Sequence, residues 1–286
     1  MIDAIRTVAV LGAGTMGNGI AHVFARCGHT VILRDVEENF LARARDTIAR
    51  NLDREVKKGT VEAGNKEKVL ARIHTTTDSS QLARADFAVE AVPERLDLKL
   101  AVLREADKLL RPEVILASNT SSISVTTLAA ATGRPDRFIG MHFMNPVPVM
   151  VLVEVIRALQ TSDETFHSTK ALCERLEKKP VAVNDAPGFV SNRVLLPMIN
   201  EAAFAVMEGV AIAEAVDAVM KLGMNHPMGP LELADFIGLD VCVNILDVLH
   251  DGFGDPKYRA CPLLRKMVAA GWLGRKSGRG FYLYSS

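Results

Sequence analysis

The chain has 286 residues, enough for one large or two modest domains with a hydrophobic core. Thirty-four basic residues balance thirty-four acidic ones, so no overall field draws the protein to a polyanion, and nucleic acid is not expected as its main partner. The four cysteines (Cys27, Cys173, Cys242 and Cys261) are far apart and form no CxxC pair, which indicates reduced thiols and neither a disulfide framework nor a metal site.

The first residues, 1–6, run directly into a strand-like segment. They contain no basic leader followed by an apolar stretch, and no later apolar run approaches the length of a membrane span. We therefore expect a cytoplasmic protein that has no membrane partner.

Up to about residue 185, short apolar runs alternate with longer helical stretches. Each run is too short for a buried helix, and several are followed by polar or glycine residues, as the ends of parallel strands usually are. Alternating strands and helices predict a parallel sheet that is covered on both faces. The predicted strands are TVAVLG (7–12), TVILRD (30–35), FAVEAV (87–92), VILASN (114–119), FIGMHF (138–143), MVLVEVI (150–156) and PVAVND (180–185).

The pattern changes after Asp185. The segment 186–188 (Ala-Pro-Gly) interrupts the chain, and almost everything that follows has a helical period. Asn184 or Asp185 is placed to cap the first of these helices, with Pro187 in its opening turn. We therefore predict a domain boundary between 1–185 and 186–286.

The predicted second domain is entirely helical and small. Its apolar helix faces need a partner to cover them, so a homodimer formed through this domain is expected. The fold class is thus α/β, a Rossmann-type doubly wound sheet followed by a smaller all-α domain. The predicted helices of this second domain cover 189–208, 212–222, 230–250 and 261–270.

The segment GAGTMG has glycines in the GxGxxG spacing. A strand-like run precedes it and a helical pattern follows, which is the context that a dinucleotide-binding loop requires. The glycines allow a tight turn, close approach of a pyrophosphate and tight packing of helix against strand, while the helix N-terminus faces the phosphates. The loop residues are Gly12, Ala13, Gly14, Thr15, Met16 and Gly17.

The second predicted strand ends at Asp35. A carboxylate there can accept hydrogen bonds from the adenosine ribose hydroxyls of NAD and would repel the additional phosphate of NADP. Arg34 beside it can reach such a phosphate, so NAD is a preference at this point. The alternative is an ordinary strand–turn–helix corner followed by a chance acidic residue.

His142 and Glu154 lie in two strand-like runs, symmetric about a segment that contains Pro146 and Pro148. If the chain reverses near residue 148, antiparallel pairing places the two residues opposite each other, with Cβ atoms about 4.5–5.5 Å apart. A carboxylate that binds one imidazole nitrogen fixes the tautomer, and the other nitrogen acts as a base. The alternative is a core histidine with a structural partner.

The polar run 118–122 (SNTSS) follows another predicted strand, at the edge of the sheet where ligands bind. Its hydroxyl and amide groups, including Asn119 and Ser121, can bond a substrate carbonyl or the nicotinamide ribose. The alternative is a helix cap, a position that Ser and Asn favour.

Taken together, these segments resemble the 3-hydroxyacyl-CoA dehydrogenase family, in particular its short bacterial 3-hydroxybutyryl-CoA dehydrogenases. The resemblance covers essentially the whole chain, and its most specific parts are the stretch 140–156 and the PGFVSNR run. It is carried by VLGAGTMGNGIA (10–21), EAVPERLDLK (90–99), ASNTSSISVT (117–126), GMHFMNPVPVMVLVEVI (140–156), DAPGFVSNRVLLPMINEA (185–202), HPMGPLELADFIGLD (226–240) and GWLGRKSGRGFYLY (271–284).

The resemblance implies an NAD-dependent enzyme that oxidises the 3-hydroxyl of a short 3-hydroxyacyl-CoA, or runs the reverse reduction. It makes His142 the catalytic base and Glu154 its orienting partner, with Ser121 and Asn192 as polar contacts to the reacting part of the substrate. In the oxidation, neutral His142 takes the hydroxyl proton while hydride leaves for the nicotinamide; in the reduction, protonated His142 is the acid.

The resemblance also implies further binding residues. Lys58 is expected to contact a CoA phosphate, with a solvated helix lysine as the alternative, and Asn51 stands where the family has a serine that touches CoA. The cofactor contacts implied beside the glycine loop and Asp35 are Glu94, Lys99, Asn119, Ser121, Asn145 and Lys276.

Other functions fit parts of this pattern. Dehydrogenases of free 3-hydroxy acids share the glycine motif but rely on a lysine base in the helical domain, and the His142–Glu154 pair argues against them. A non-catalytic dinucleotide-binding relative, like some lens crystallins, would be expected to lose these residues first. Association with a separate hydratase chain is a third alternative. Acyl length and physiological direction stay open.

Overall fold

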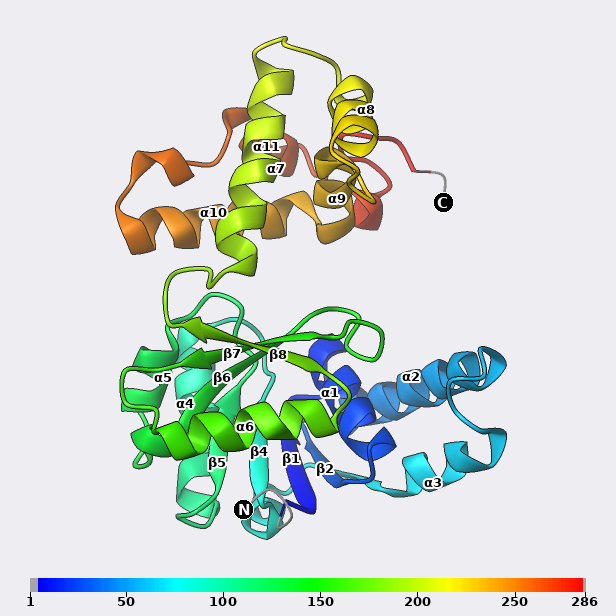
Figure 1. Cartoon of the computed structure of the whole chain (residues 1–286), viewed down its shortest axis with the longest axis vertical. Helices are drawn as coiled ribbons and strands as arrows, with labels where there is room; N and C mark the ends of the chain where they lie inside the picture. Colours follow the sequence, from blue (N-terminus) through cyan, green and yellow to red (C-terminus); the bar gives the residue numbers. More distant parts are fainter. Residues whose placement is uncertain (1–4, 285–286) are drawn as a thin grey trace. The chain divides into compact units, whose positions relative to one another are not determined.

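The computed structural model describes residues 5–284, and the chain forms two compact units (Figure 1). Unit 1 is Met1–Asp185 and unit 2 is Ala186–Ser286. Residues 1–4, on which part of the expectation of a leader-free start depends, lie outside the described residues. Within 5–284, no helix is both long and apolar enough to cross a membrane. All four cysteines carry free thiols.

Unit 1 contains one sheet of eight strands. The strands are β1 Thr7–Leu11, β2 Thr30–Arg34, β3 Ile73–Thr76, β4 Phe87–Glu90, β5 Ile115–Ser118, β6 Phe138–Phe143, β7 Leu152–Arg157 and β8 Lys179–Asn184. Their order across the sheet is β3-β2-β1-β4-β5-β6-β7-β8. Neighbouring strands are parallel except β6 and β7, which are antiparallel. The seven predicted strands are confirmed, each with ends at most two residues from the predicted ones.

Strand β3 is the one strand of this sheet that the sequence does not predict. Its four residues, IHTT, include a single buried side chain, that of Ile73. Because β3 is an edge strand with polar residues on both sides of its backbone, it lacks the apolar run that marks the other strands.

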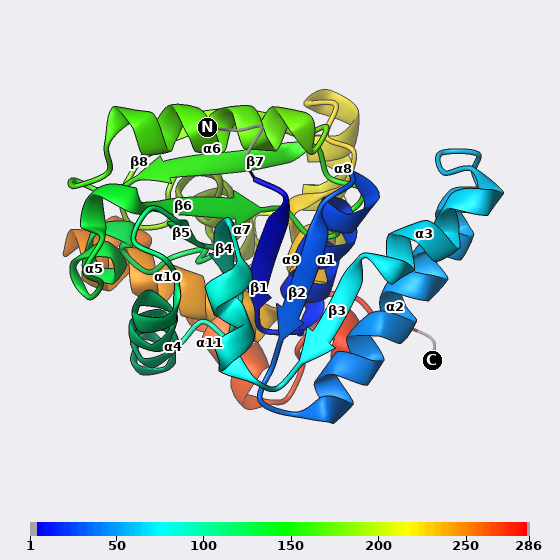
Figure 2. The same ribbon diagram turned by 90° about the horizontal axis from the view of Figure 1, so that it is seen from below.

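Helices cover both faces of the sheet (Figure 2). Phe24 of α1, Ile48 of α2 and Leu172 of α6 join one core with Val8 and Val10 of β1. Helices α4 and α5 pack against β4 and β6 on the other face. The strands are therefore buried on both sides, which explains their nearly continuous apolar sequences. The helices are α1 Thr15–Arg26, α2 Glu38–Lys57, α3 Lys66–Ala71, α4 Leu96–Leu109, α5 Val125–Ala130 and α6 Asp163–Arg175.

Unit 2 is helical, as predicted, and has its own core. Leu196 and Ile199 of α7 pack with Leu231 of α9, Leu246 of α10 and Leu264 of α11. The helices are α7 Ser191–Met207, α8 Ala213–Gly223, α9 Pro230–Ile237, α10 Leu239–Phe253 and α11 Pro262–Ala269.

The single helix predicted over 230–250 is wrong. The structure has two helices here, α9 and α10, separated at Gly238. Gly238 has φ +105°, a conformation that side chains of L-residues rarely adopt and that ends an α-helix. The continuous apolar period through this glycine concealed the break.

The prediction that Asn184 or Asp185 caps the first helix of unit 2 is also wrong. Helix α7 begins at Ser191, so Pro187 is not in its opening turn, and its N-cap residue Val190 makes no side-chain cap. The Asp185 carboxylate instead accepts hydrogen bonds from Val125 N (3.1 Å) and Thr126 N (2.8 Å) at the start of α5. Asp185 therefore caps a helix of unit 1 that lies 60 residues earlier.

Candidate active site

The carboxyl ends of β1, β2, β4 and β5 lie at one edge of the sheet of unit 1, because these strands are all parallel. The strand order reverses between β1 and β4. In open α/β sheets, ligands bind in the crevice at such a switch point. The glycine loop leaves β1 at this point and leads into α1.

The three glycines of the loop meet different demands. Gly12 has φ +103°, and a Cβ atom there would lie 2.7 Å from the carbonyl oxygen of Ala91, beyond the end of β4. A Cβ on Gly17 would collide with the carbonyl oxygen of Gly12. Gly14, the N-cap of α1, is exposed and has nothing within 4 Å of its Cβ position. The loop therefore leaves open the space at the helix N-terminus that a dinucleotide's pyrophosphate requires.

Asp35, just beyond β2, is tied to the glycine loop. One carboxylate oxygen accepts a hydrogen bond from Ala13 N (2.6 Å), and the other accepts one from Val36 N (2.7 Å). A carboxylate oxygen can accept more than one hydrogen bond, so Asp35 retains capacity for a ribose hydroxyl. The guanidinium of neighbouring Arg34 lies 3.8 Å from the Glu105 carboxylate, so Arg34 has an acidic partner within unit 1.

His142 and Glu154 are cross-strand partners in the antiparallel pair β6/β7, which confirms the predicted register. His142 Nδ1 lies 2.7 Å from Glu154 Oε2, and both side chains are buried. Because an ionised carboxylate only accepts hydrogen bonds, this geometry assigns the Nδ1 proton to the imidazole and makes Nε2 the atom able to take a proton. The pair thus has the arrangement of an acid–base dyad.

The polar run 118–122 does not cap a helix. Helix α5 begins at Val125, and the hydroxyl of Ser124 caps it by accepting a hydrogen bond from Thr127 N. The run is held instead by Glu94, which follows β4. Its Oε1 accepts hydrogen bonds from Thr120 Oγ1 (2.6 Å), Ser121 N (2.9 Å) and Ser122 N (3.0 Å).

Glu94 is therefore an anchor of the loop that carries Ser121. Burial would raise the pKa of the Glu94 carboxyl, but the Lys99 charge and the hydrogen bonds from Thr120 and Ser121 outweigh it, and the pKa is lowered. The sequence offered Glu94 only through the family resemblance, and nothing in its spacing predicted that it binds this loop.

Lys99 and Glu90 are both fully buried, and Lys99 lies next to Glu94. Lys99 Nζ donates to Glu90 Oε1 (2.7 Å) and Val92 O (3.1 Å), and lies 3.2 Å from Glu94 Oε2. Three acceptors thus match the three N–H groups of the ammonium. Glu90, the last residue of β4, is a residue of this edge that the sequence reasoning missed, although a charged residue ending an apolar strand is a signal for it.

Two asparagines of the predicted site follow the carboxyl ends of β5 and β6. Asn119 Oδ1 accepts a hydrogen bond from Phe143 N (2.9 Å), which ties the end of β5 to the residue beside His142. Asn145 lies in the β6–β7 connection and is exposed. That connection is anchored by the buried Lys178, whose Nζ donates to the carbonyl oxygens of Val147 (2.6 Å) and Met150 (2.7 Å).

The remaining predicted residues are distributed between the units. Asn51 lies within α2, where its Oδ1 accepts a hydrogen bond from Arg54 (3.2 Å), and Lys58 is exposed at the C-cap of the same helix. In unit 2, Asn192 is the second residue of α7, and Lys276 donates to Asp240 (2.7 Å). A role in binding stays a prediction for these four residues.

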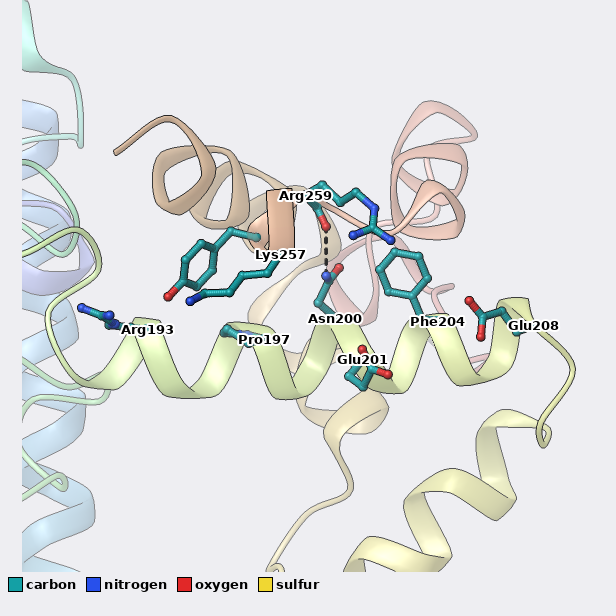
Figure 3. A pocket seen from close by; sticks show the side chains of 9 residues that line it. Arg193, Pro197, Asn200, Glu201, Phe204, Glu208, Lys257 and Arg259 are labelled. Carbon is teal, nitrogen blue, oxygen red and sulfur yellow. Dashed lines mark hydrogen bonds between the residues drawn. The ribbon is translucent and has the colours of Figure 1, made fainter. Parts of the chain in front are cut away.

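Unit 2 also contains a cavity of about 500 Å³ along α7. Figure 3 shows the side chains that line it, with Asn200 Nδ2 donating to the carbonyl oxygen of Arg259 (3.0 Å). None of the predicted site residues lines it. Its lining is Arg193, Pro197, Asn200, Glu201, Phe204, Glu208, Lys257, Tyr258 and Arg259.

Two family models match the chain in succession. The NAD-binding domain of 3-hydroxyacyl-CoA dehydrogenase matches residues 7–186, and the C-terminal domain of 3-hydroxyacyl-CoA dehydrogenase matches residues 188–284. The chain belongs to the 3-hydroxyacyl-CoA dehydrogenase family. The resemblance noted from its motifs is thereby confirmed.

Individual relatives match over almost the whole chain. The probable 3-hydroxybutyryl-CoA dehydrogenase of Deinococcus radiodurans is 57% identical, covering 96% of this chain and 99% of that protein. The 3-hydroxybutyryl-CoA dehydrogenase of Bradyrhizobium diazoefficiens is 54% identical, with 99% and 97% covered. The crystal structure of the (S)-3-hydroxybutyryl-CoA dehydrogenase of Ralstonia eutropha is similar with a TM-score of 0.96 and 52% identity, covering 99% of this chain and 100% of that one.

Family membership makes the chain a dehydrogenase with a nicotinamide dinucleotide as its cofactor. The residues of unit 1 fit such a cofactor, because the open Gly14 position lies at the N-terminus of α1 and the Asp35 carboxylate lies beside it.

Proposed function

We propose that this dehydrogenase oxidises the 3-hydroxyl of short 3-hydroxyacyl-CoA thioesters, 3-hydroxybutyryl-CoA in particular, and catalyses the reverse reduction. The observation that carries the proposal is the His142–Glu154 pair, buried and hydrogen-bonded on the two strands that follow the nucleotide-binding part of the sheet. The names of the similar proteins support the substrate class.

In this mechanism His142 moves the proton. With Nδ1 bound to Glu154, Nε2 takes the proton of the 3-hydroxyl in the oxidation and returns it to the carbonyl oxygen in the reduction. Glu154 holds the ring orientation and stabilises the imidazolium that forms. The bound nicotinamide supplies the hydride chemistry. Ser121 and Asn192 bind the oxygen atoms of the reacting part of the substrate.

The cofactor in this proposal is NAD. The Asp35 carboxylate accepts a ribose hydroxyl and repels the additional phosphate of NADP. The Arg34–Glu105 pair supports this preference, because an arginine that has an acidic neighbour is a weaker ligand for that phosphate. The glycine loop, Glu94, Lys99, Asn119, Asn145 and Lys276 form the rest of the proposed cofactor site.

The CoA part of the substrate is proposed to lie near α2, with Lys58 bound to a phosphate and Asn51 beside it. Exposed Lys58 is compatible with such a contact. Charge reversal at Lys58 should raise the KM for the CoA thioester and leave the KM for the cofactor unchanged.

The proposed assembly is a homodimer formed through unit 2 in the cytoplasm. Several large apolar side chains are exposed on α7, α8 and the adjoining loops, more than a small monomeric unit usually leaves in water. An acidic substitution at Leu222 should shift the sedimentation coefficient to that of a monomer. These exposed residues are Val194, Met207, Val210, Ile212, Val219, Leu222 and Met224.

The test of the function follows the absorbance of the reduced nicotinamide while the purified protein is mixed with acetoacetyl-CoA, with NADH and NADPH in separate reactions. Rapid oxidation of NADH that is abolished in His142→Ala supports the substrate, the cofactor and the base together. No turnover with acetoacetyl-CoA or with longer 3-ketoacyl-CoA thioesters, in folded protein that binds NADH, would contradict the enzyme and favour a non-catalytic relative.

A further inference from the structure

Glu90 has no role in the chemistry described above, yet it is a fully buried carboxylate at the ligand edge of the sheet. Its Oε1 accepts hydrogen bonds from Lys99 Nζ (2.7 Å) and Val92 N (2.7 Å), and its Oε2 accepts one from Ser118 Oγ (2.5 Å). Removing a charge from water is costly even when it is paired, and apolar residues often replace such pairs without loss of stability. A buried ion pair at this position therefore calls for a reason other than stability.

The contacts of Glu90 extend to the groups proposed to bind ligands. Through Lys99 it reaches Glu94, whose second oxygen holds the backbone N–H groups of Ser121 and Ser122. Ser118 gives it a second connection to the same loop, because the Ser118 hydroxyl oxygen accepts a weak hydrogen bond from Thr120 N (3.2 Å). One buried carboxylate thus connects to both attachments of the loop.

The segment that carries Glu94 has no regular structure to hold it. Glu94 lies between β4 and α4, and its side chain is one-third exposed. Two carboxylates share the single ammonium of Lys99, so the orientation of Glu94 depends on how Glu90 places that ammonium. Lys99 is fully buried, and Glu90, Val92 and Glu94 supply an acceptor for each of its N–H groups, so these contacts fix its ammonium.

We propose that Glu90 is a positioning residue: through Lys99 and Ser118 it fixes Glu94 and the 120–122 loop, and with them Ser121, in the geometry that hydride transfer requires. The proposal rests on the proposed function. Catalytic geometry is demanding, since a displacement of about 1 Å can reduce a rate by about 10²-fold. Glu90 is fully buried, so it acts on the site through Lys99 and Ser118.

The test compares Glu90→Met and Glu90→Gln with the wild-type protein. Glu90→Met removes every hydrogen bond of the carboxylate, whereas Glu90→Gln keeps an acceptor oxygen for Lys99. The kcat of folded Glu90→Met should fall about 10- to 10²-fold below wild type, because the anchor of Glu94 is displaced, while the KM for acetoacetyl-CoA changes less. Glu90→Gln should recover much of this loss, and the melting temperature of each variant shows that it is folded.

A matched control is the ion pair between buried Arg134 and half-buried Asp107, at the amino-terminal side of β6. Asp107→Asn should lower stability and leave the kcat of the folded protein unchanged. Ser118→Ala, which removes only one contact of Glu90, should reduce kcat by a smaller factor than Glu90→Met and report on the network even if Glu90→Met fails to fold.

The outcomes separate the two levels of the proposal. Wild-type protein that reduces no 3-ketoacyl-CoA would overturn the proposed function. Active wild type, with wild-type kcat in folded Glu90→Met and Ser118→Ala, would show that the Glu90–Lys99 contact is only a structural ion pair and would overturn the inference. A folded Glu90→Met that is slow, with kcat partly recovered in Glu90→Gln, supports it.

Discussion

The two units bury carboxylates to a similar degree but give them different partners. In unit 1, Glu154 is bound to the imidazole of His142, and Glu90 is bound to the ammonium of Lys99. In unit 2, the partners are backbone N–H groups and tyrosine hydroxyls.

Asp217 of unit 2 accepts hydrogen bonds from Leu231 N (2.9 Å), Glu232 N (2.8 Å) and the Tyr282 hydroxyl (2.7 Å). Asp235 accepts them from Phe281 N and Tyr282 N, both at 3.0 Å. Asp217 therefore caps α9, and Asp235 holds the backbone of residues 281 and 282. Donors of this kind exchange no proton near neutral pH, whereas an imidazole does. The difference teaches that burial alone does not distinguish these carboxylates; the groups that they bind do.

The largest expected effect is on activity and concerns His142. His142→Ala should lower kcat about 10²- to 10⁴-fold, because the proposed proton acceptor is removed, and should leave cofactor affinity nearly intact. Glu154→Gln, which keeps a side chain of the same size, should fall between wild type and that variant. Steady-state kinetics with NADH and acetoacetyl-CoA, beside a fluorescence titration with NADH, measure both quantities. Parallel loss of NADH binding would contradict the role given to His142.

The second effect is on stability and concerns Asp217. Asp217→Ala leaves three donors without their acceptor and removes the cap of α9, so the free energy of unfolding should fall by about 2–4 kcal/mol. The kcat of the folded fraction should stay at the wild-type value. Urea denaturation followed by circular dichroism measures the first quantity. Asp217→Asn, which retains one acceptor oxygen, is the control and should lose less. A kcat that falls with Asp217→Ala would remove the distinction between the units.

Much of unit 1 was predictable because its strands are short apolar runs that end at polar residues. The His142–Glu154 pair was predictable for a related reason: antiparallel register follows from the position of one chain reversal. Strand β3 was missed because an edge strand with one buried residue carries no such pattern.

The contact between Glu90 and Lys99 depends instead on the path of the irregular segment that connects β4 and α4. The two residues are nine positions apart, and no period fixes their contact. Asp185 fails as a predicted cap for a similar reason, since it binds the start of a helix 60 residues earlier. Local patterns predict elements and register, and they do not predict which loop a buried charge will hold.

The third effect tests whether apolar packing also fixes the edge of the sheet where the proposed site lies. A Cβ atom on Gly19 of α1 would lie 2.8 Å from Cβ of Val147, in the β6–β7 connection that carries Asn145. Gly19→Ala should therefore cost about 1–3 kcal/mol of stability, although alanine normally favours a helix over glycine. Thermal unfolding measures this change. Gly19→Ala/Val147→Ala should recover part of it, and a single variant that is more stable than wild type would show that the contact is not tight.

The smallest expected effect is a pair of opposite pH dependences. Burial raises the pKa of Asp235, although the hydrogen bonds from Tyr282 and Phe281 oppose this shift. The pKa of Glu94 is lowered, because Lys99 and the hydrogen-bond donors of the loop outweigh the effect of burial. In the window just above the ordinary aspartate pKa, folded Asp235 binds more protons than unfolded Asp235, so its contribution to stability falls as pH rises. Below the ordinary glutamate pKa, folded Glu94 binds fewer protons than unfolded Glu94, so its contribution is present above that pKa and is lost as pH falls.

Asp235→Asn and Glu94→Gln should therefore change the pH profile of stability with opposite slopes. As pH falls into the acidic range, the stability of Glu94→Gln should decline less than that of wild type. As pH rises from about 4, the stability of Asp235→Asn should decline less than that of wild type. Urea midpoints between about pH 3 and pH 6 measure both. Slopes of the same sign would mean that the cationic partner in unit 1 and the backbone partners in unit 2 act alike on the carboxyl that they bind, and the contrast between the units would then rest on activity alone.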